Sequence, residues 1–266
     1  MTALGKNELD IKNEGAVFSL LSQVRPQFLV NCAGWTDVNE AENFPIEANL
    51  VNAISMIGIT NACVSLGIKL IHISTDYVFS GESNNSYEVD SERIPVNRYG
   101  ETKLAGEVII ESTNLLKYWI LRSSWLYGNS NNDFISKLLD KYRKSEDPIL
   151  VVDDQIGHPT YVFDLAKKII EVIALEPNFG TYHASNSGST SWFKFAQEAF
   201  QLLGLDYTRI LPIKYSELNL DINRPSRVIL DLSKWESVNL APMRNWAVAL
   251  NDCLKRGNLY YENHAT

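Results

Sequence analysis

The stretch FLVNCAG (28–34) is a short, almost entirely apolar segment that ends at a glycine. A run of this length that is apolar on both faces is typical of a strand buried in a parallel sheet. Apolar residues precede it at helical spacing from Val17 to Val24, and Pro26 ends that helix. The segment therefore predicts a helix–strand unit of an α/β fold.

Further helices and strands follow in alternation. The expected elements are a helix over 45–66 that ends at Gly67, a strand over 68–74, a helix over 98–115, a strand over 118–123, a helix over 133–144, a strand over 148–152 and a helix over 163–175. Strands separated by helices of this length predict a doubly wound parallel sheet. After about residue 150 the alternation is less regular, which favours a smaller C-terminal lobe packed at the carboxyl edge of the sheet.

The composition restricts the kind of protein. The chain has 266 residues, of which 45% are hydrophobic and 21% charged, and its net charge is −8 without any basic run. Nucleic acid and anionic membranes are therefore not expected as partners. Cys32, Cys63 and Cys253 are too widely spaced for a disulfide framework or a metal site. No signal sequence or membrane-length apolar run is evident, so we expect a soluble, cytoplasmic protein without a metal ion.

Small polar and aromatic residues follow three of the expected strands. They lie in NCAGWT (31–36), HISTDYVF (72–79) and LRSSWLYG (121–128). The carboxyl ends of parallel strands meet at one edge of a sheet, and ligands bind in the crevice at that edge. The three segments therefore predict a binding crevice.

The stretch RYGETKLAGE (98–107) places Tyr99 four residues before Lys103, on one face of a helix. With Thr75, these residues offer a phenol, an ammonium and a hydroxyl, which suit proton transfer to or from a carbonyl or alcohol oxygen. Because an ammonium favours the phenolate, we expect Lys103 to lower the pKa of Tyr99 from about 10. Taken alone, each pattern has an ordinary alternative, namely an amphipathic helix and a helix-cap turn.

Seven motifs, in this order, resemble the dTDP-4-dehydrorhamnose reductase family of the extended short-chain dehydrogenase/reductase superfamily. They are NCAGWTDVNEAE, HISTDYVFSG, RYGETKLAGE, RSSWLYG, DDQIGHPT, SWFKFA and RPSRVILD. The similarity covers essentially the whole chain. HISTDYVF and RYGETKLAGE alone would also fit other sugar-nucleotide reductases and epimerases, and DQIGHPT narrows the choice considerably. The resemblance implies a Rossmann-like dinucleotide-binding domain over 1–150. Residues 151–266 would form mainly a substrate-binding lobe, with some segments returning to the sheet.

The resemblance also implies an activity. NADPH or NADH would reduce the C4 keto group of dTDP-4-dehydro-L-rhamnose to give dTDP-L-rhamnose. The partner would be a small-molecule nucleotide sugar. A homodimer is compatible with the sequence, which leaves the oligomeric state open.

The resemblance assigns individual roles. Tyr99 would donate the proton, Lys103 would hold the nicotinamide ribose and tune Tyr99, and Thr75 would bind the keto oxygen. The residues expected to contact the cofactor are Asp10, Ile11, Asn31, Ala33, Gly34, Thr36, Ser74, Tyr99 and Lys103. The residues expected to contact the substrate are Thr75, Trp125, Gln155, Thr160 and Arg224.

Some of these residues have simpler interpretations. Trp125 could be a structural residue after a strand, DDQIGHPT could be only a turn, and Arg224 could lie on the surface. His72 and His183 are expected to be buried core residues within strands, since no carboxylate or metal-ligand spacing accompanies them.

The start of the sequence departs from the family pattern. Family members begin with a strand, a glycine-rich turn and a helix that hold the pyrophosphate. This sequence begins at MTALGKNELDI (1–11), and neither GxGxxG nor GxxGxxG occurs in it. We therefore expect a fold that lacks its first βαβ portion, with one edge of 28–34 exposed and cofactor bound weakly. The alternatives are a non-catalytic regulatory homologue, resembling the methionine adenosyltransferase beta subunit, or an inactive truncated fragment.

Overall fold

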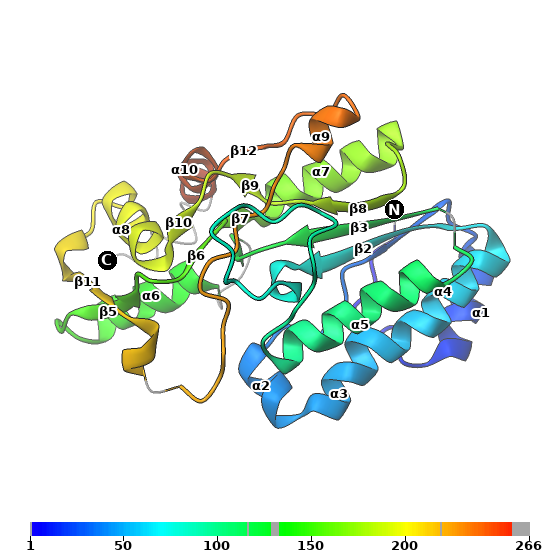
Figure 1. The fold of residues 1–266 in the computed structure, drawn as a ribbon, viewed down its shortest axis with the longest axis horizontal. Helices are drawn as coiled ribbons and strands as arrows, with labels where there is room; N and C mark the ends of the chain where they lie inside the picture. Colours follow the sequence, from blue (N-terminus) through cyan, green and yellow to red (C-terminus); the bar gives the residue numbers. More distant parts are fainter. Residues whose placement is uncertain (1, 116, 129–132, 219, 257–266) are drawn as a thin grey trace.

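A four-stranded parallel sheet in the order β1–β2–β3–β8 forms the centre of the computed structural model (Figure 1), which describes residues 2–115, 117–128, 133–218 and 220–256. Its strands are β1 (Phe28–Asn31), β2 (Lys69–Thr75), β3 (Tyr118–Ser123) and β8 (Gly180–His183). The predicted parallel α/β sheet is confirmed. Among the described residues β1 pairs with β2 alone, and the expected lack of a first βαβ portion stays a prediction.

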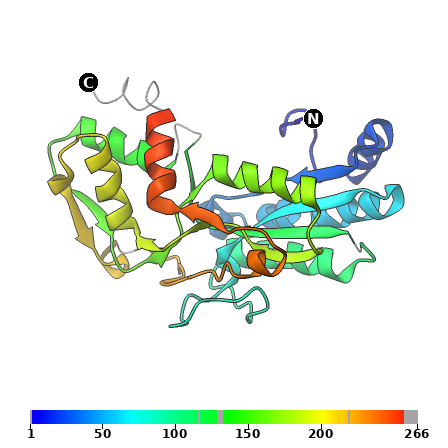
Figure 2. The ribbon, with the colours of Figure 1, turned by 90° about the horizontal axis from the view of Figure 1, so that it is seen from above.

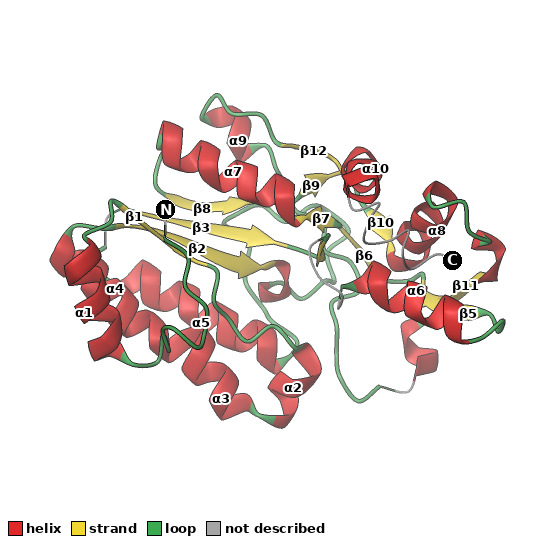
Figure 3. Cartoon of the chain, turned by 180° about the vertical axis from the view of Figure 1, so that it is seen from behind, coloured by secondary structure: helices red, strands yellow, loops and turns green. Residues whose placement is uncertain are grey.

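Helices cover both faces of this sheet (Figures 1 and 3). One face carries α1 (Glu14–Val24), α4 (Ser55–Leu66) and α5 (Arg98–Ser112), and the other carries α7 (Val162–Leu175) and α9 (Lys234–Ser237). Side chains alternate along the strands accordingly. Leu70 and Ile120 pack towards the first group of helices, and their neighbours Ile71, Trp119 and Leu121 pack towards the second.

The helix expected over 45–66 is present but is not uniform. It consists of α3 (Pro45–Asn49), a π-helical turn η1 (Leu50–Ile54) and α4, and Gly67 ends it with a left-handed φ of 69°. Contrary to our expectation, this stretch of 22 residues is long and apolar enough to span a membrane, since an 18-residue window within it has a mean hydropathy of 1.4. Half of it is buried inside the fold, where α4 packs against α1 and α5. It is therefore a core helix.

The second lobe lies beyond the carboxyl ends of the strands (Figure 2). Its helices are α6 (Phe134–Lys144), α8 (Trp192–Leu202) and α10 (Trp246–Arg256), and it contains a separate parallel pair, β5 (Ile149–Val152) with β11 (Ile210–Ile213). The expectation that 148–152 continues the main sheet is wrong. The alternation of helix and strand in the sequence is the same whether the strand joins the main sheet or pairs elsewhere. Here α6 and β5 bury their apolar faces against α8 rather than against β3.

The remaining elements are short. They are α2 (Val38–Asn43), η2 (Asp76–Val78), β4 (Leu126–Tyr127), β6 (Ile156–Gly157), β7 (Thr160–Tyr161), β9 (Asn186–Ser187), β10 (Thr190–Ser191), η3 (Tyr207–Arg209), η4 (Tyr215–Leu218) and β12 (Met243–Asn245). The hydrophobic cluster of the lobe already includes Tyr127 and Ile135. We therefore propose that the substrate-binding lobe begins near β4 rather than at residue 151.

Candidate active site

The start of α5 is held against the end of β2, and this contact positions Tyr99. The side chain of Asn97 caps the helix by accepting the backbone N–H of Gly100 at 2.9 Å. Gly100 lies so close to η2 that a Cβ atom there would come within 2.3 Å of the carbonyl oxygen of Tyr77. The side chain of Tyr99 then lies beside that of Thr75, which acts on its pKa. The structure therefore brings together the two residues that the sequence placed on separate elements.

The phenol of Tyr99 is protonated in this environment. Burial raises its pKa above the usual value, the hydrogen bond from Thr75 opposes this, and Asp76 and Tyr77 raise the pKa further. We expected Lys103 to lower the pKa of Tyr99, and the direction in the structure is the opposite. Desolvation dominates, and the amine of Lys103 is directed elsewhere.

Lys103 is buried under the end of β2. Its Nζ donates to the carbonyl oxygen of Ile73 at 2.8 Å and lies 3.3 Å from Nε2 of His72. Burial lowers the pKa of Lys103 to about 8, while Glu107 and Cys32 act in the opposite direction. The amine can therefore take up and release a proton near neutral pH.

The loop after β1 passes directly beside this amine. Asn52, in the π-helical turn, fixes the loop by accepting the N–H of Trp35 at 2.8 Å and donating to its carbonyl oxygen at 3.0 Å. A Cβ atom on Gly34 would lie 3.2 Å from Oδ1 of Asn52 and 3.9 Å from Nζ of Lys103. The glycine thus leaves bare backbone next to the amine, with exposed Ala33 on one side. Thr36 is also exposed.

The serines at the strand ends differ from expectation. The hydroxyl of Ser74 donates to Oε1 of Glu107 at 2.5 Å and is directed at α5. Ser123 lies in register with Thr75 on the neighbouring strand. Its buried Oγ has no hydrogen-bond partner within the part of the chain that the structure describes. Ser123, which our sequence reasoning missed, is therefore a further candidate for a ligand contact, and the contact expected of Ser74 stays a prediction.

Gln155 and Arg224 line one pocket of about 390 Å³, together with residues of η4. Nε2 of Gln155 is buried without a hydrogen-bond partner among the described residues. Arg224 donates to Oδ1 of Asn39 at 2.9 Å and to the hydroxyl of Tyr77 at 3.5 Å. Arg224 therefore links this pocket to the residues beyond β1 and β2.

Two other predicted substrate contacts, Thr160 and Trp125, are not in the lining of that pocket, and the cofactor contacts expected of Asp10 and Ile11 stay predictions. Thr160 is fully buried, and its hydroxyl bonds the carbonyl oxygen of His158. Trp125 stacks on Trp192 with ring centroids 3.7 Å apart. Asp10 is exposed, and Ile11 packs against the cluster between α1 and α4.

Asn31 and His72 lie inside the site, but neither faces solvent. His72 is buried within β2, as expected, yet it contacts Asn31 as well as Lys103. The sequence carried a signal for this contact, because His72 precedes Ser74 by two residues and so shares the face that α5 covers. His183 is buried in β8, where its Nδ1 lies 3.0 Å from the carbonyl oxygen of Asp231.

A parallel sheet with Thr75 at a strand end, and Tyr99 and Lys103 on the following helix, defines a nucleotide-dependent reductase of the short-chain dehydrogenase/reductase class. The family described as the RmlD substrate binding domain matches residues 1–259. The chain belongs to this family of dTDP-4-dehydrorhamnose reductases.

Individual relatives agree with that placement. The chain is 39% identical over 256 residues to a dTDP-4-dehydrorhamnose reductase of Streptomyces griseus, covering 95% of this chain and 84% of the relative. It is 35% identical to a dTDP-4-keto-6-deoxy-D-glucose reductase of Streptomyces niveus, with 94% and 86% covered. A Bacillus anthracis dTDP-4-dehydrorhamnose reductase solved in complex with NADP superimposes with a TM-score of 0.88 at 35% identity, covering 95% and 88% of the two chains.

Proposed function

We propose that this protein is a cytoplasmic enzyme that uses NADPH to reduce the C4 keto group of dTDP-4-dehydro-L-rhamnose. The product is dTDP-L-rhamnose, a nucleotide sugar for polysaccharide biosynthesis. The observation that carries the proposal is the meeting of Thr75, Tyr99 and Lys103 at the carboxyl edge of the sheet. A non-catalytic regulatory role is not favoured, because all three residues are present and the matched relatives are reductases.

The residues beside Lys103 fit a nicotinamide dinucleotide. The amine, the bare backbone at Gly34 and the exposed Thr36 offer a donor, close approach and a hydroxyl to a ribose. The unpartnered hydroxyl of Ser123 offers a further donor at the adjacent strand end. When bound, NADPH supplies the hydride that C4 of the sugar accepts.

The protein supplies the proton. Tyr99 keeps its proton through neutral pH because burial raises its pKa. As C4 gains hydride, the former keto oxygen takes the proton of the Tyr99 hydroxyl, which leaves a phenolate. Thr75 donates a hydrogen bond to the same oxygen and so fixes its position. Lys103, with a pKa of about 8, can take up and release a proton near neutral pH and so helps to restore the proton of Tyr99.

The nucleotide end of the substrate is assigned to the pocket of Gln155 and Arg224. A guanidinium matches two oxygens of a diphosphate in a bidentate hydrogen bond. Arg224 already reaches across from the lobe to Tyr77, which borders Tyr99 with ring centroids 5.4 Å apart. A diphosphate at Arg224 would therefore place the sugar near Tyr99.

Arg224→Ala is expected to raise the KM for the nucleotide sugar by about 10- to 100-fold, since charge-assisted hydrogen bonds contribute about 1.5–3 kcal/mol. The value of kcat should change less. Steady-state kinetics at saturating NADPH measure both. Arg209→Ala is the control, because Arg209 lies over the ring of Tyr142 within the lobe. An unchanged KM in Arg224→Ala would contradict the assignment.

The activity itself is tested with purified protein, NADPH and dTDP-4-dehydro-L-rhamnose. We expect NADPH to be oxidised and the product to be identified as dTDP-L-rhamnose by NMR. Because one relative is named as a dTDP-4-keto-6-deoxy-D-glucose reductase, that sugar is the second substrate to compare. A higher kcat/KM with the second sugar would replace the first assignment. Folded protein inactive on both would contradict the proposal.

A further inference from the structure

A chain of three polar contacts leads from the loop after β1 to the amine of Lys103. The backbone N–H of Ala33 donates to Oδ1 of Asn31 at 3.1 Å. Nδ2 of Asn31 lies 3.1 Å from Nδ1 of His72, and Nε2 of His72 lies 3.3 Å from Nζ of Lys103. The side chains of Asn31, His72 and Lys103 are all buried.

The direction of the hydrogen bonds along this chain is fixed at the Ala33 end. A backbone N–H can only donate, so the amide oxygen of Asn31 must face it. The amide nitrogen, which also lies 3.2 Å from the sulfur of Met56, then faces the imidazole. Since this nitrogen can only donate, Nδ1 of His72 must accept. The single proton of a neutral imidazole is therefore on Nε2, the nitrogen that faces Lys103.

This tautomer has a consequence for the lysine. A protonated amine has only donors, so it would meet the Nε2–H of His72 donor against donor. A neutral amine has a lone pair that accepts the Nε2–H while one of its own N–H groups still donates to the carbonyl oxygen of Ile73. The three polar contacts between Ala33 and Lys103 are all satisfied only when the amine of Lys103 is neutral.

We propose that His72 is a positioning residue that Asn31 holds as the Nε2–H tautomer, so that it donates to Lys103 and favours the neutral form of its amine. The part that His72 plays in reduction rests on the proposed function. The tautomer and its effect on Lys103 do not.

The electrostatic surroundings agree with this direction. Burial lowers the pKa of His72 well below its usual value, so the ring is neutral at physiological pH. The other titratable groups that face Lys103 are Glu107 on its own helix and Cys32 after β1, and both raise its pKa. Burial outweighs them, and the imidazole donor acts in the same direction as burial. Removal of the imidazole donor should therefore raise the pKa of Lys103.

The first measurement is the tautomer of His72 by ¹⁵N NMR of the full chain, without any ligand. The four histidines of the sequence are distinguished by the signal that disappears in His72→Gln. His183→Gln is the matched control, since His183 is equally buried in the sheet but contacts Asp231 rather than Lys103. We expect the proton on Nε2 of His72. A proton on Nδ1 overturns the proposal.

The second measurement follows the titration of Lys103 through its ¹³Cε signal. Asn31→Asp replaces the donor facing His72 by an acceptor. This should reverse the direction of the hydrogen bond between residue 31 and His72, moving the imidazole proton to Nδ1. His72→Gln removes the imidazole donor altogether. In both variants the midpoint for Lys103 should rise by about one pH unit, and in His183→Gln it should not move. An unchanged midpoint in His72→Gln overturns the proposal. If Asn31→Asp does not fold, the wild-type tautomer and His72→Gln still decide.

Activity separates this inference from the proposed function. If the protein is an active reductase, the pH dependence of kcat/KM should contain a step due to the titration of Lys103. The pH of that step should shift together with the midpoint measured by NMR. A wild-type protein with the Nε2–H tautomer but no reductase activity would contradict the proposed function alone.

Discussion

Tyr99→Phe is expected to lower kcat/KM for NADPH-dependent reduction of the keto sugar by about 10²- to 10⁴-fold, the usual contribution of a positioned general acid. The ring remains, so its edge-on contact with Tyr77 is kept. Only the phenolic hydroxyl beside Thr75 is lost. Steady-state kinetics of the wild type and the variant, with circular dichroism to show equal folding, measure the effect.

Tyr77→Phe is the matched control for that variant. Tyr77 is buried next to Tyr99, and burial raises its pKa to about 12, with Arg224 acting in the opposite direction. Because the hydroxyl of Tyr77 contacts Arg224 rather than Thr75, its loss should cost at most about tenfold. Comparable losses in the two variants, or turnover retained in Tyr99→Phe, would exclude Tyr99 as the proton donor.

The positions of the proposed catalytic residues could be predicted from the sequence because they depend on local geometry. A strand that ends at Thr75 and a helix that carries Tyr99 and Lys103 one turn apart leave few relative positions in a parallel sheet. The same periodicity predicted the helix that ends at Gly67. These features need no knowledge of which elements meet across the fold.

Features that depend on distant contacts could not be read in this way. The apolar run of β5 looks like any buried strand, and only its packing against α8 places it outside the sheet. The hydroxyl of Ser74 suits a ligand, but Glu107, 33 positions later, takes it. The pKa of Tyr99 depends on burial, which the spacing of Tyr99 and Lys103 does not indicate.

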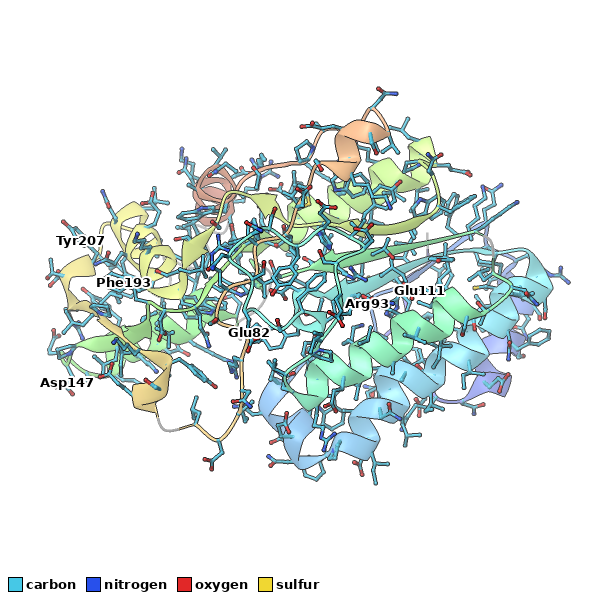
Figure 4. All side chains as sticks on the ribbon, viewed as in Figure 1. Glu82, Arg93, Glu111, Asp147, Phe193 and Tyr207 are labelled. Atoms are coloured by element: carbon cyan, nitrogen blue, oxygen red, sulfur yellow. The ribbon has the colours of Figure 1, made fainter. Side chains whose placement is uncertain are left out.

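Glu107 is the centre of a buried ionic network behind the site. It accepts from Arg122 at 2.8 and 3.0 Å, from Ser74 at 2.5 Å and from Arg93 at 3.0 Å. Arg93 also pairs with Glu111 at 2.9 Å, and both residues are labelled beside α5 in Figure 4. The side chains of Glu107 and Arg122 are 0% and 1% exposed, so neither can be solvated if the other is removed.

Glu107→Ala is therefore expected to lower the free energy of unfolding by about 3–5 kcal/mol, the usual cost of leaving a buried charge unpaired. Urea denaturation at neutral pH measures this loss. Glu101→Ala, on the same helix, removes a solvent-exposed pair with Arg98 and should cost less than about 1 kcal/mol. Equal losses in the two variants would contradict the buried network.

The pH dependence of stability tests the same network through the charge of Glu107. Burial alone would raise the pKa of this carboxyl, but the hydrogen bonds from Arg122, Ser74 and Arg93 outweigh it and hold the pKa below its usual 4.5. A carboxyl whose pKa is lower in the folded state stabilises the protein above its unfolded pKa, and the stabilisation is lost as the pH falls through the folded value. The difference in unfolding free energy between wild type and Glu107→Ala should therefore be constant above about pH 5 and decrease below it. A difference that grew on acidification would mean that Glu107 is protonated in the folded protein.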